Sequence, residues 1–240
     1  MADHTNSHTV TAFDQDLDWL TLAITDMGGQ AERMVVDSVR ALTTGDDKLA
    51  AAVIQNDVAI DRAEREIDER AVLTIARRQP MASDLREIVG SIRIAADLER
   101  VGDLGKNIAK RVAAVQEVSH PRTVMHGIEH LANLARDQLA AVLDAYASRD
   151  VDRLGEVRDR DEDIDAMYTS LFREMLTYMM EDPRTISSCT HLLFCAKNIE
   201  RIGDHATNIA ETLHYVATGE QMAPDRPKGD GSAGMTLAAE

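Results

Sequence analysis

One segment of this 240-residue chain occurs twice, and that repetition limits the folds open to it. The stretches Glu99-Arg-Val-Gly-Asp103 and Asn107-Ile-Ala109 return 101 residues later as Glu200-Arg-Ile-Gly-Asp204 and Asn208-Ile-Ala210. Seven of the eleven positions spanned are identical, which chance rarely produces. Self-similarity at a fixed spacing indicates a supersecondary unit copied in tandem. The fold must therefore accommodate two similar halves.

Breaks in the helical pattern come at long and similar intervals in the two halves. They fall at 44–46, 79–80 and 119–123, and again at 149–150, 182–183 and 219. Only 3% of the residues are aromatic and five are proline, which is typical of long helices rather than sheets. We predict an all-α protein of six long helices, each of roughly 25–35 residues, arranged as two tandem three-helix bundles with internal pseudo-two-fold symmetry.

This reading divides the chain into five parts. Repeats occupy 14–118 and 124–218, with a linker at 119–123 between them. We expect residues 1–13 to be flexible, and residues 219–240, rich in Gly, Pro, Ser and charge, to be disordered. The repeat also reaches upstream, because three positions recur 104 residues later: Asp57, Ile60 and Asp61 return as Asp161, Ile164 and Asp165.

The formal net charge of −16 limits the partners. It opposes direct binding to nucleic acid, because contact with a phosphate backbone would begin with repulsion. The sequence shows no signal peptide and no apolar run long enough to span a bilayer. We expect a cytoplasmic protein that meets membranes only through its partners.

Acidic residues continue the apolar rows of the third helix in each half. The row Leu85, Ile88, Ile92, Ala95 leads to Glu99 and Asp103, and Ile186, Cys189, Leu193, Ala196 lead to Glu200 and Asp204. The second helix of each half brings another acidic pair, four residues apart: Asp57 with Asp61, and Asp161 with Asp165. We expect each half to form a quartet of carboxylates in which neighbouring helices face each other.

Carboxylates four residues apart lie about 5–6 Å apart at Cβ, so they repel each other and can reach one cation. An all-oxygen site suits Mg, Mn, Ca or iron, and zinc is a poorer fit. Solvated acidic faces, or neutralisation by Arg100 and Arg201, are the alternatives. Asn107 and Asn208 follow one turn later and would orient a ligand or satisfy backbone groups.

The two cysteines point away from each other in a helical pattern, so a disulfide is not expected between Cys189 and Cys195. His191 and Cys195 share a helix face, but two ligands are a weak zinc signal and packing is favoured.

Four segments resemble the signature of the PhoU (PhoY) family: Arg78 to Arg86, Leu98 to Asp103, Asn107 to Ala109, and Asn198 to Glu211. The similarity extends from about Phe13 to Ala217. The resemblance implies two symmetry-related three-helix bundles that carry iron or other metal clusters on paired acidic motifs. The matching residues are Asp57, Asp61, Glu99, Asp103, Asp161, Asp165, Glu200 and Asp204. One departure is that Arg184 to Ser187 replaces the Asp-Leu-Arg of the first copy.

The resemblance also implies a function. Members restrain the phosphate-starvation response when phosphate is plentiful, acting between the ATPase of a phosphate ABC transporter and a sensor histidine kinase. We further expect a homodimer.

Two other functions stay open. A ferritin-like di-iron enzyme needs Glu-x-x-His motifs, which occur here as Glu117 with His120 and Glu211 with His214. His120 precedes Pro121, however, which biases it away from helical geometry. A metal-free helical adaptor is the third possibility. Because the sequence has no phosphate-binding glycine loop and no nucleophile motif, we expect no enzyme activity.

Overall fold

The computed structural model describes residues 3–116 and 121–222, and within them all extended regular structure is helical. Six long helices occur in the predicted order, with a five-residue helix and one 3₁₀ turn between them. They are α1 (Asp3–Thr44), α2 (Asp47–Arg78), α3 (Ser83–Ala109), α4 (Val112–Gln116), α5 (Arg122–Ser148), α6 (Leu154–Glu181), η1 (Pro183–Thr185) and α7 (Ile186–Thr218). The all-α prediction is confirmed. Across the described ranges, none of the helices has the length and apolarity needed to cross a bilayer.

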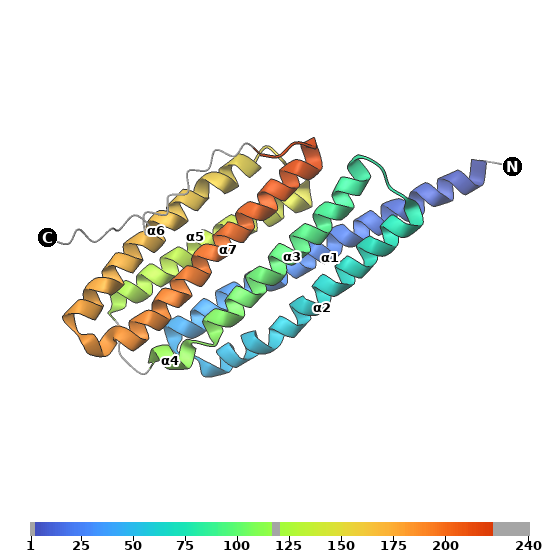
Figure 1. Cartoon of the computed structure of the whole chain (residues 1–240). Coiled ribbons are helices and arrows are strands. Elements are labelled where there is room, and N and C mark those ends of the chain that lie inside the picture. Colours follow the sequence, from blue (N-terminus) through green and yellow to red (C-terminus); the bar gives the residue numbers. More distant parts are fainter. Residues whose placement is uncertain (1–2, 117–120, 223–240) are drawn as a thin grey trace.

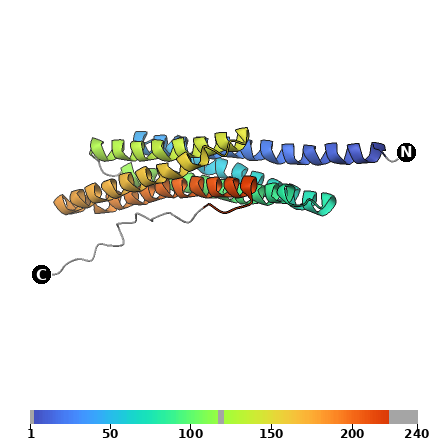
Figure 2. The same cartoon turned by 90° about the horizontal axis from the view of Figure 1, so that it is seen from above.

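The long helices form two groups of three that lie side by side (Figures 1 and 2). Helices α1, α2 and α3 pack on one another, and so do α5, α6 and α7. Contacts of α3 with α7 and of α1 with α5 join the groups, so one apolar core runs through both. Positions related by the repeat are buried in both halves: Ile60 and Ile164, Leu98 and Ile199, Val101 and Ile202, Ile108 and Ile209. The predicted two-fold relation between the halves agrees with this burial and stays a prediction.

Helix ends in the first half follow local chemistry. Asp46 caps α2, because its carboxylate accepts hydrogen bonds from the backbone N–H groups of Lys48 and Leu49, both at 3.0 Å. Gly45 before it has a φ of +72°, which glycine adopts without strain. At the other end of α2, Gln79 takes a left-handed conformation next to Pro80, which cannot continue the helix.

Two boundaries of the first half follow from the local sequence. The backbone of residues 3–13 is helical, because this stretch contains neither proline nor glycine to end the helix, and the expected flexibility of residues 1–13 stays a prediction. The third helix ends at Ala109, where the N–H of Arg111 donates to the carbonyl of Ile108 and tightens the turn before α4. Of the expected linker, 119–120 lie outside the described residues, as do 223–240 of the expected tail.

Candidate metal centre

A glycine allows the third helix of each half to pack closely on the second, beside the acidic residues. A Cβ atom on Gly102 would lie 2.9 Å from Cδ1 of Ile60, and one on Gly203 would lie 2.9 Å from Cδ1 of Ile164. Such distances are shorter than real side-chain contacts, so only glycine fits without a shift. Ile60 lies one turn after Asp57, and Gly102 directly precedes Asp103. This packing therefore brings carboxylates of the two helices toward each other, as the sequence predicted.

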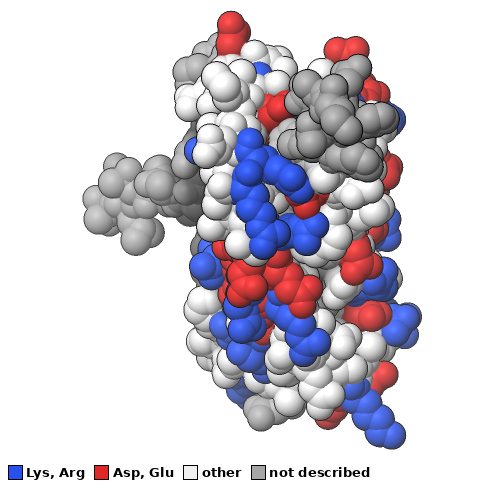
Figure 3. All heavy atoms as spheres, turned by 90° about the vertical axis from the view of Figure 1, so that its right-hand side faces the viewer, with Lys and Arg blue, Asp and Glu red and all other residues white. Residues whose placement is uncertain are grey.

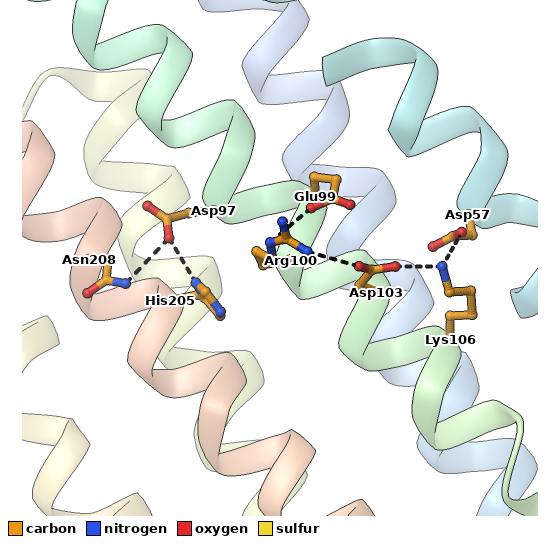
Figure 4. Close-up of polar contacts among 8 residues, drawn as sticks. All are labelled: Asp57, Asp97, Glu99, Arg100, Asp103, Lys106, His205 and Asn208. Carbon is orange, nitrogen blue, oxygen red and sulfur yellow. Dashed lines mark hydrogen bonds and ion pairs between the residues drawn. The ribbon is translucent and has the colours of Figure 1, made fainter. Parts of the chain in front are cut away.

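In the first half, a lysine joins the acidic helices. Lys106 Nζ donates to Asp57 Oδ2 of α2 at 2.6 Å and also to Asp103 Oδ1 of its own helix (Figure 4). Arg100 contacts Glu99 and Asp103, both at 3.4 Å, from a more exposed position. The quartet predicted from Asp57, Asp61, Glu99 and Asp103 thus contains a cation that belongs to the chain itself.

The electrostatics of this half reflect burial and crowding. Burial raises the pKa of Glu99, and the neighbouring charge of Asp103 raises it further. Burial disfavours the charged form of Lys106, yet its hydrogen bonds to Asp103 and Asp57 raise the pKa of Lys106 well above its ordinary value. The ammonium is therefore held in its charged form between two carboxylates.

Sequence reasoning missed three charged residues of this site. Lys106 is one, and Glu64 and Asp68 on α2 are the others. Burial raises the pKa of Glu64, and the charges of Asp68 and Asp61 add to the effect. The signal was present in the helical spacing, since Glu64 and Asp68 continue the face of Asp57 and Asp61. This acidic spacing is not repeated in the second half, where Tyr168 and Phe172 occupy the corresponding positions.

The second quartet lies deeper and is held differently. Asp161 and Glu200 are both buried. Thr207 Oγ1 donates to Asp161 Oδ1 at 3.2 Å, and Lys197 Nζ donates to Glu200 Oε1 at 2.7 Å. Glu200 Oε2 is also buried, and it accepts no hydrogen bond from the described part of the chain.

Burial raises the pKa of Glu200, and the charges of Asp204 and Asp165 act in the same direction against the opposing Lys197. Glu200 is therefore coupled electrostatically to Asp204 and Asp165. An incoming cation would relieve the repulsion among them.

The carboxylates do not converge on one point. Among the described residues, no three His, Cys, Asp or Glu side chains are grouped closely enough to hold one ion. In each half, a lysine of the chain itself contacts the carboxylates that were expected to share one metal ion: Lys106 in the first half and Lys197 in the second. These ammonium groups offset part of the repulsion that a bound metal would otherwise remove. The role of the eight acids as metal ligands stays a prediction.

The contacts of His191 and Cys195 favour packing over a zinc site. Arg111 Nη1 donates to His191 Nδ1 at 3.1 Å, and its guanidinium lies 4.4 Å from the ring centre of Phe194. A cation on that nitrogen competes with a metal. Cys195 is fully buried, and burial raises the pKa of its thiol to about 12, so the protonated form is retained.

Asn208 makes a contact between the halves. Its Nδ2 donates to Asp97 Oδ1 at 3.4 Å, and Nδ1 of His205 lies 2.8 Å from the same oxygen (Figure 4). Asp97 belongs to α3, whereas Asn208 and His205 belong to α7. In this structure the amide of Asn208 thus tethers α7 to α3 rather than orienting a carboxylate of the second quartet.

One part of the surface groups charges of both signs. Near the centre of the face shown in Figure 3, a patch of Asp and Glu side chains lies between Lys and Arg side chains above and below it, and further acidic side chains lie at the top and along the right-hand edge. A partner with a complementary pattern would find both signs of charge on this face.

Comparison with known proteins decides the family. The PhoU domain model matches residues 24–112 and again residues 128–213, one match in each half. The chain belongs to the PhoU family. The sequence-based recognition is thereby confirmed.

Relatives in the PhoU family match nearly the whole chain. The phosphate-specific transport system accessory protein PhoU homolog of Rhizobium meliloti is 65% identical over 225 residues, which cover 94% of this chain and 95% of that protein. The protein of the same description from Caulobacter vibrioides is 48% identical over 93% of this chain and 97% of its own length. These names describe accessory proteins rather than enzymes, in agreement with the expectation of no enzyme activity.

Solved PhoU structures share the fold. The crystal structure of PhoU from Pseudomonas aeruginosa has a TM-score of 0.83 at 39% identity and covers 87% of this chain and all of that one. The regulatory protein PhoU of the phosphate transport system from Streptococcus pneumoniae has a TM-score of 0.81 at 27% identity, over 88% of this chain and 99% of that one.

The ferritin-like alternative rested on two Glu-x-x-His motifs. One of them, Glu117 with His120, lies outside the described residues.

Proposed function

We propose that this chain is an accessory protein of a phosphate-specific transport system, and that it restrains phosphate uptake and the phosphate-starvation response when phosphate is plentiful. The observation that carries the proposal is the 65% identity, over 94% of the chain, to a protein described as such an accessory protein. The PhoU domain matches in both halves support the same conclusion.

The proposed partners are the ATPase subunit of the phosphate ABC transporter and a sensor histidine kinase, met in the cytoplasm by a homodimer of this chain. The family resemblance supports these partners, and the net charge of −16 supports basic docking surfaces on them. Association driven by opposite charges weakens as salt screens them. Binding to either partner should therefore be tighter at low ionic strength.

The proposed ligand is a hard metal ion held by the acidic quartets, with iron the first candidate by family resemblance. The second quartet supplies the structural support. It combines two buried carboxylates, Asp161 and Glu200, with a buried Glu200 oxygen that accepts no hydrogen bond within the described residues. An all-carboxylate donor set suits iron, manganese or magnesium.

A deletion strain tests the regulatory proposal. A reporter fused to a phosphate-uptake promoter should be active in phosphate-rich medium when the gene is deleted, and silent again when the wild-type gene is restored. Pull-downs at low and high salt should recover the ATPase or the kinase mainly at low salt. A silent reporter in the deletion strain, with no second family member in that genome, would sink the proposal. Full repression by a variant that binds no metal would instead support the metal-free adaptor.

A further inference from the structure

A cavity of about 260 Å³ lies between the two groups of helices, and we call it the inter-group cavity. It is found where the end of α7 passes the first turns of α3, and α1, α5 and the start of α6 complete its walls (Figure 1). Most of its lining is apolar, and Ile94, Leu154 and Leu213 contribute to it. A benzene ring fits an apolar cavity of about 150 Å³, so this one has room for a ring with a short chain.

The hydroxyl groups inside the cavity satisfy one another. The hydroxyls of Thr21 and Ser91 are hydrogen-bonded to that of Tyr146. Both also donate to backbone carbonyls of their own helices, at 3.1 Å and 2.9 Å. Burial raises the pKa of Tyr146, so its neutral form is retained. Because these groups need no polar atom from a ligand, an apolar body can lie against them.

The internal repeat provides a comparison, because the equivalent place at the other end of the two groups is filled. Ser91 corresponds to Leu192, 101 residues later, and Tyr146 corresponds to Leu42, 104 residues earlier. Both leucines are buried in the core. The cavity is therefore a feature of one end of the molecule, where small or polar side chains replace apolar ones.

The rim of the cavity differs between the two ends in the same way. The side chain of Gln116 lies so close to Gly45 that a Cβ atom there would clash with it. The residue that corresponds to Gln116 is Ala217, which lines the cavity and has no side chain long enough to cover it. Unfilled space forfeits packing contacts, so an occupant of the right size would stabilise this end.

An ion pair stands at the mouth of the cavity, and its two members differ in burial. Arg149 Nη2 donates to Glu87 Oε1 at 2.7 Å. The arginine side chain is 67% exposed, whereas the glutamate side chain is 28% exposed. A pair with so exposed a member contributes little to stability. The guanidinium can therefore move into solvent, while the carboxylate stays at the cavity.

The charges around the mouth favour a cationic ligand over an anionic one. Asp150 is a second carboxylate of the lining, so an anionic head group bound to Arg149 would face two like charges. Arg86 is not among the lining residues, and its Nε donates to the backbone carbonyl of Val216 at 3.3 Å. The net charge of −16 also attracts cations rather than anions. An ammonium group suits Glu87, because a charge-assisted hydrogen bond between them is strong.

We propose that the inter-group cavity binds a small primary amine with an apolar body. Its ammonium group replaces Arg149 at Glu87, and its body lies against Ile94, Leu154 and Leu213. Because the walls come from both groups of helices, the bound amine holds the two groups together and stabilises the folded protein. This inference is independent of the regulatory and metal-binding proposals.

Three probes with the same aromatic ring test the head group on the full-length protein: 2-phenylethylamine, 2-phenylethanol and phenylacetate. Binding is followed by NMR of ¹³C-labelled isoleucine and leucine methyl groups. The amine should shift the signals of Ile94 and Leu213 with a Kd of about 1 mM, as expected for so small a ligand. The alcohol should bind at least about tenfold more weakly, and phenylacetate should not bind measurably.

Substitutions at the cavity separate charge from shape. Glu87→Gln should lower the affinity for the amine to that for the alcohol, whereas the control Glu66→Gln, exposed on α2 and not part of the lining, should change neither. Arg149→Asn removes the competing cation and keeps a residue that tolerates the left-handed backbone, so the amine should bind about two- to threefold more tightly. Ser91→Leu introduces the residue of the other repeat and should abolish binding of both the amine and the alcohol. Circular dichroism melts establish that each variant is folded.

Equal affinities for the amine and the alcohol, or an amine affinity that folded Glu87→Gln leaves unchanged, would overturn the proposed head group. Tighter binding of phenylacetate than of the amine would make Arg149 the recognising group and would also overturn it. If about 10 mM of each probe leaves the methyl signals of Ile94 and Leu213 unshifted, the cavity is not a ligand site and the inference fails.

Discussion

The two repeat glycines should respond differently to the same substitution. Alanine at either position gains about 0.8–1.0 kcal/mol of helix propensity over glycine. Against this stands the cost of overpacking, typically about 1–3 kcal/mol. At Gly102 the atoms in the way are Cδ1 of Ile60 at 2.9 Å and Cγ2 of the same side chain at 3.3 Å, and only the terminal methyl must shift by more than a few tenths of an ångström, so the cost lies at the low end. Gly102→Ala should therefore change the free energy of unfolding by less than about 0.5 kcal/mol.

At Gly203 the new Cβ meets two atoms, Cδ1 of Ile164 and Oε1 of Gln138, each 2.9 Å away. The glutamine cannot move freely, because its Nε2 is held by Val157 and Thr207. The cost lies at the high end, and the net loss for Gly203→Ala is about 1–2 kcal/mol.

For a chain of this size that loss lowers the Tm by roughly 2–8 °C, against about 2 °C or less for Gly102→Ala. Thermal unfolding followed by far-UV circular dichroism measures the difference. Gly155→Ala is the control, because nothing lies within 4 Å of its Cβ, and it should not destabilise. Equal Tm values for the Gly102 and Gly203 variants would refute the reasoning that Gln138 is locked in place.

Three further predictions concern charge, capping and thiol reactivity. Burial and Asp103 raise the pKa of Glu99 above its ordinary 4.5, so its ionised form opposes folding as the pH rises through the folded-state value. Glu99→Gln should accordingly raise the Tm at neutral pH and leave it unchanged below pH 4.5, as melts across a pH series would reveal. Asp46→Ala removes the cap of α2 and should cost about 1 kcal/mol in urea unfolding, whereas a cost near zero would argue against the cap. Both cysteines are buried, so Ellman's reagent should titrate almost no thiol in the native protein and both thiols after denaturation.

The sequence was sufficient for the helices and for the placement of the acids. The periodicity and the breaks predicted six long helices, and the acidic pairs on the second and third helices of each half predicted that these helices face each other. Lys106 confirms that meeting, because one ammonium reaches Asp57 on α2 and Asp103 on α3. The sequence could predict which acids share a helix face, because side-chain direction along a helix depends only on local spacing.

The sequence could not predict that Lys106 is the group that bridges Asp57 and Asp103. Lys106 lies three residues from Asp103, a common spacing for an exposed ion pair, and only the packing of α2 on α3 reveals that it also reaches Asp57. Glu64 and Asp68 were not predicted as site residues because they are not repeated: the equivalent positions of the second half are Tyr168 and Phe172. The early end of α3 at Ala109 also lacks a proline or glycine signal, since the turn at Arg111 is a tightening of the backbone rather than a break.

Phosphate uptake itself is the most direct test of the proposed regulatory role. Initial rates of radiolabelled phosphate uptake would be compared in phosphate-rich medium for the wild type, the deletion strain, and the deletion strain carrying the restored gene. The account predicts faster uptake in the deletion strain and a return to the wild-type rate on restoration. Equal rates in all three strains, in a genome with no second PhoU-family gene, would contradict it.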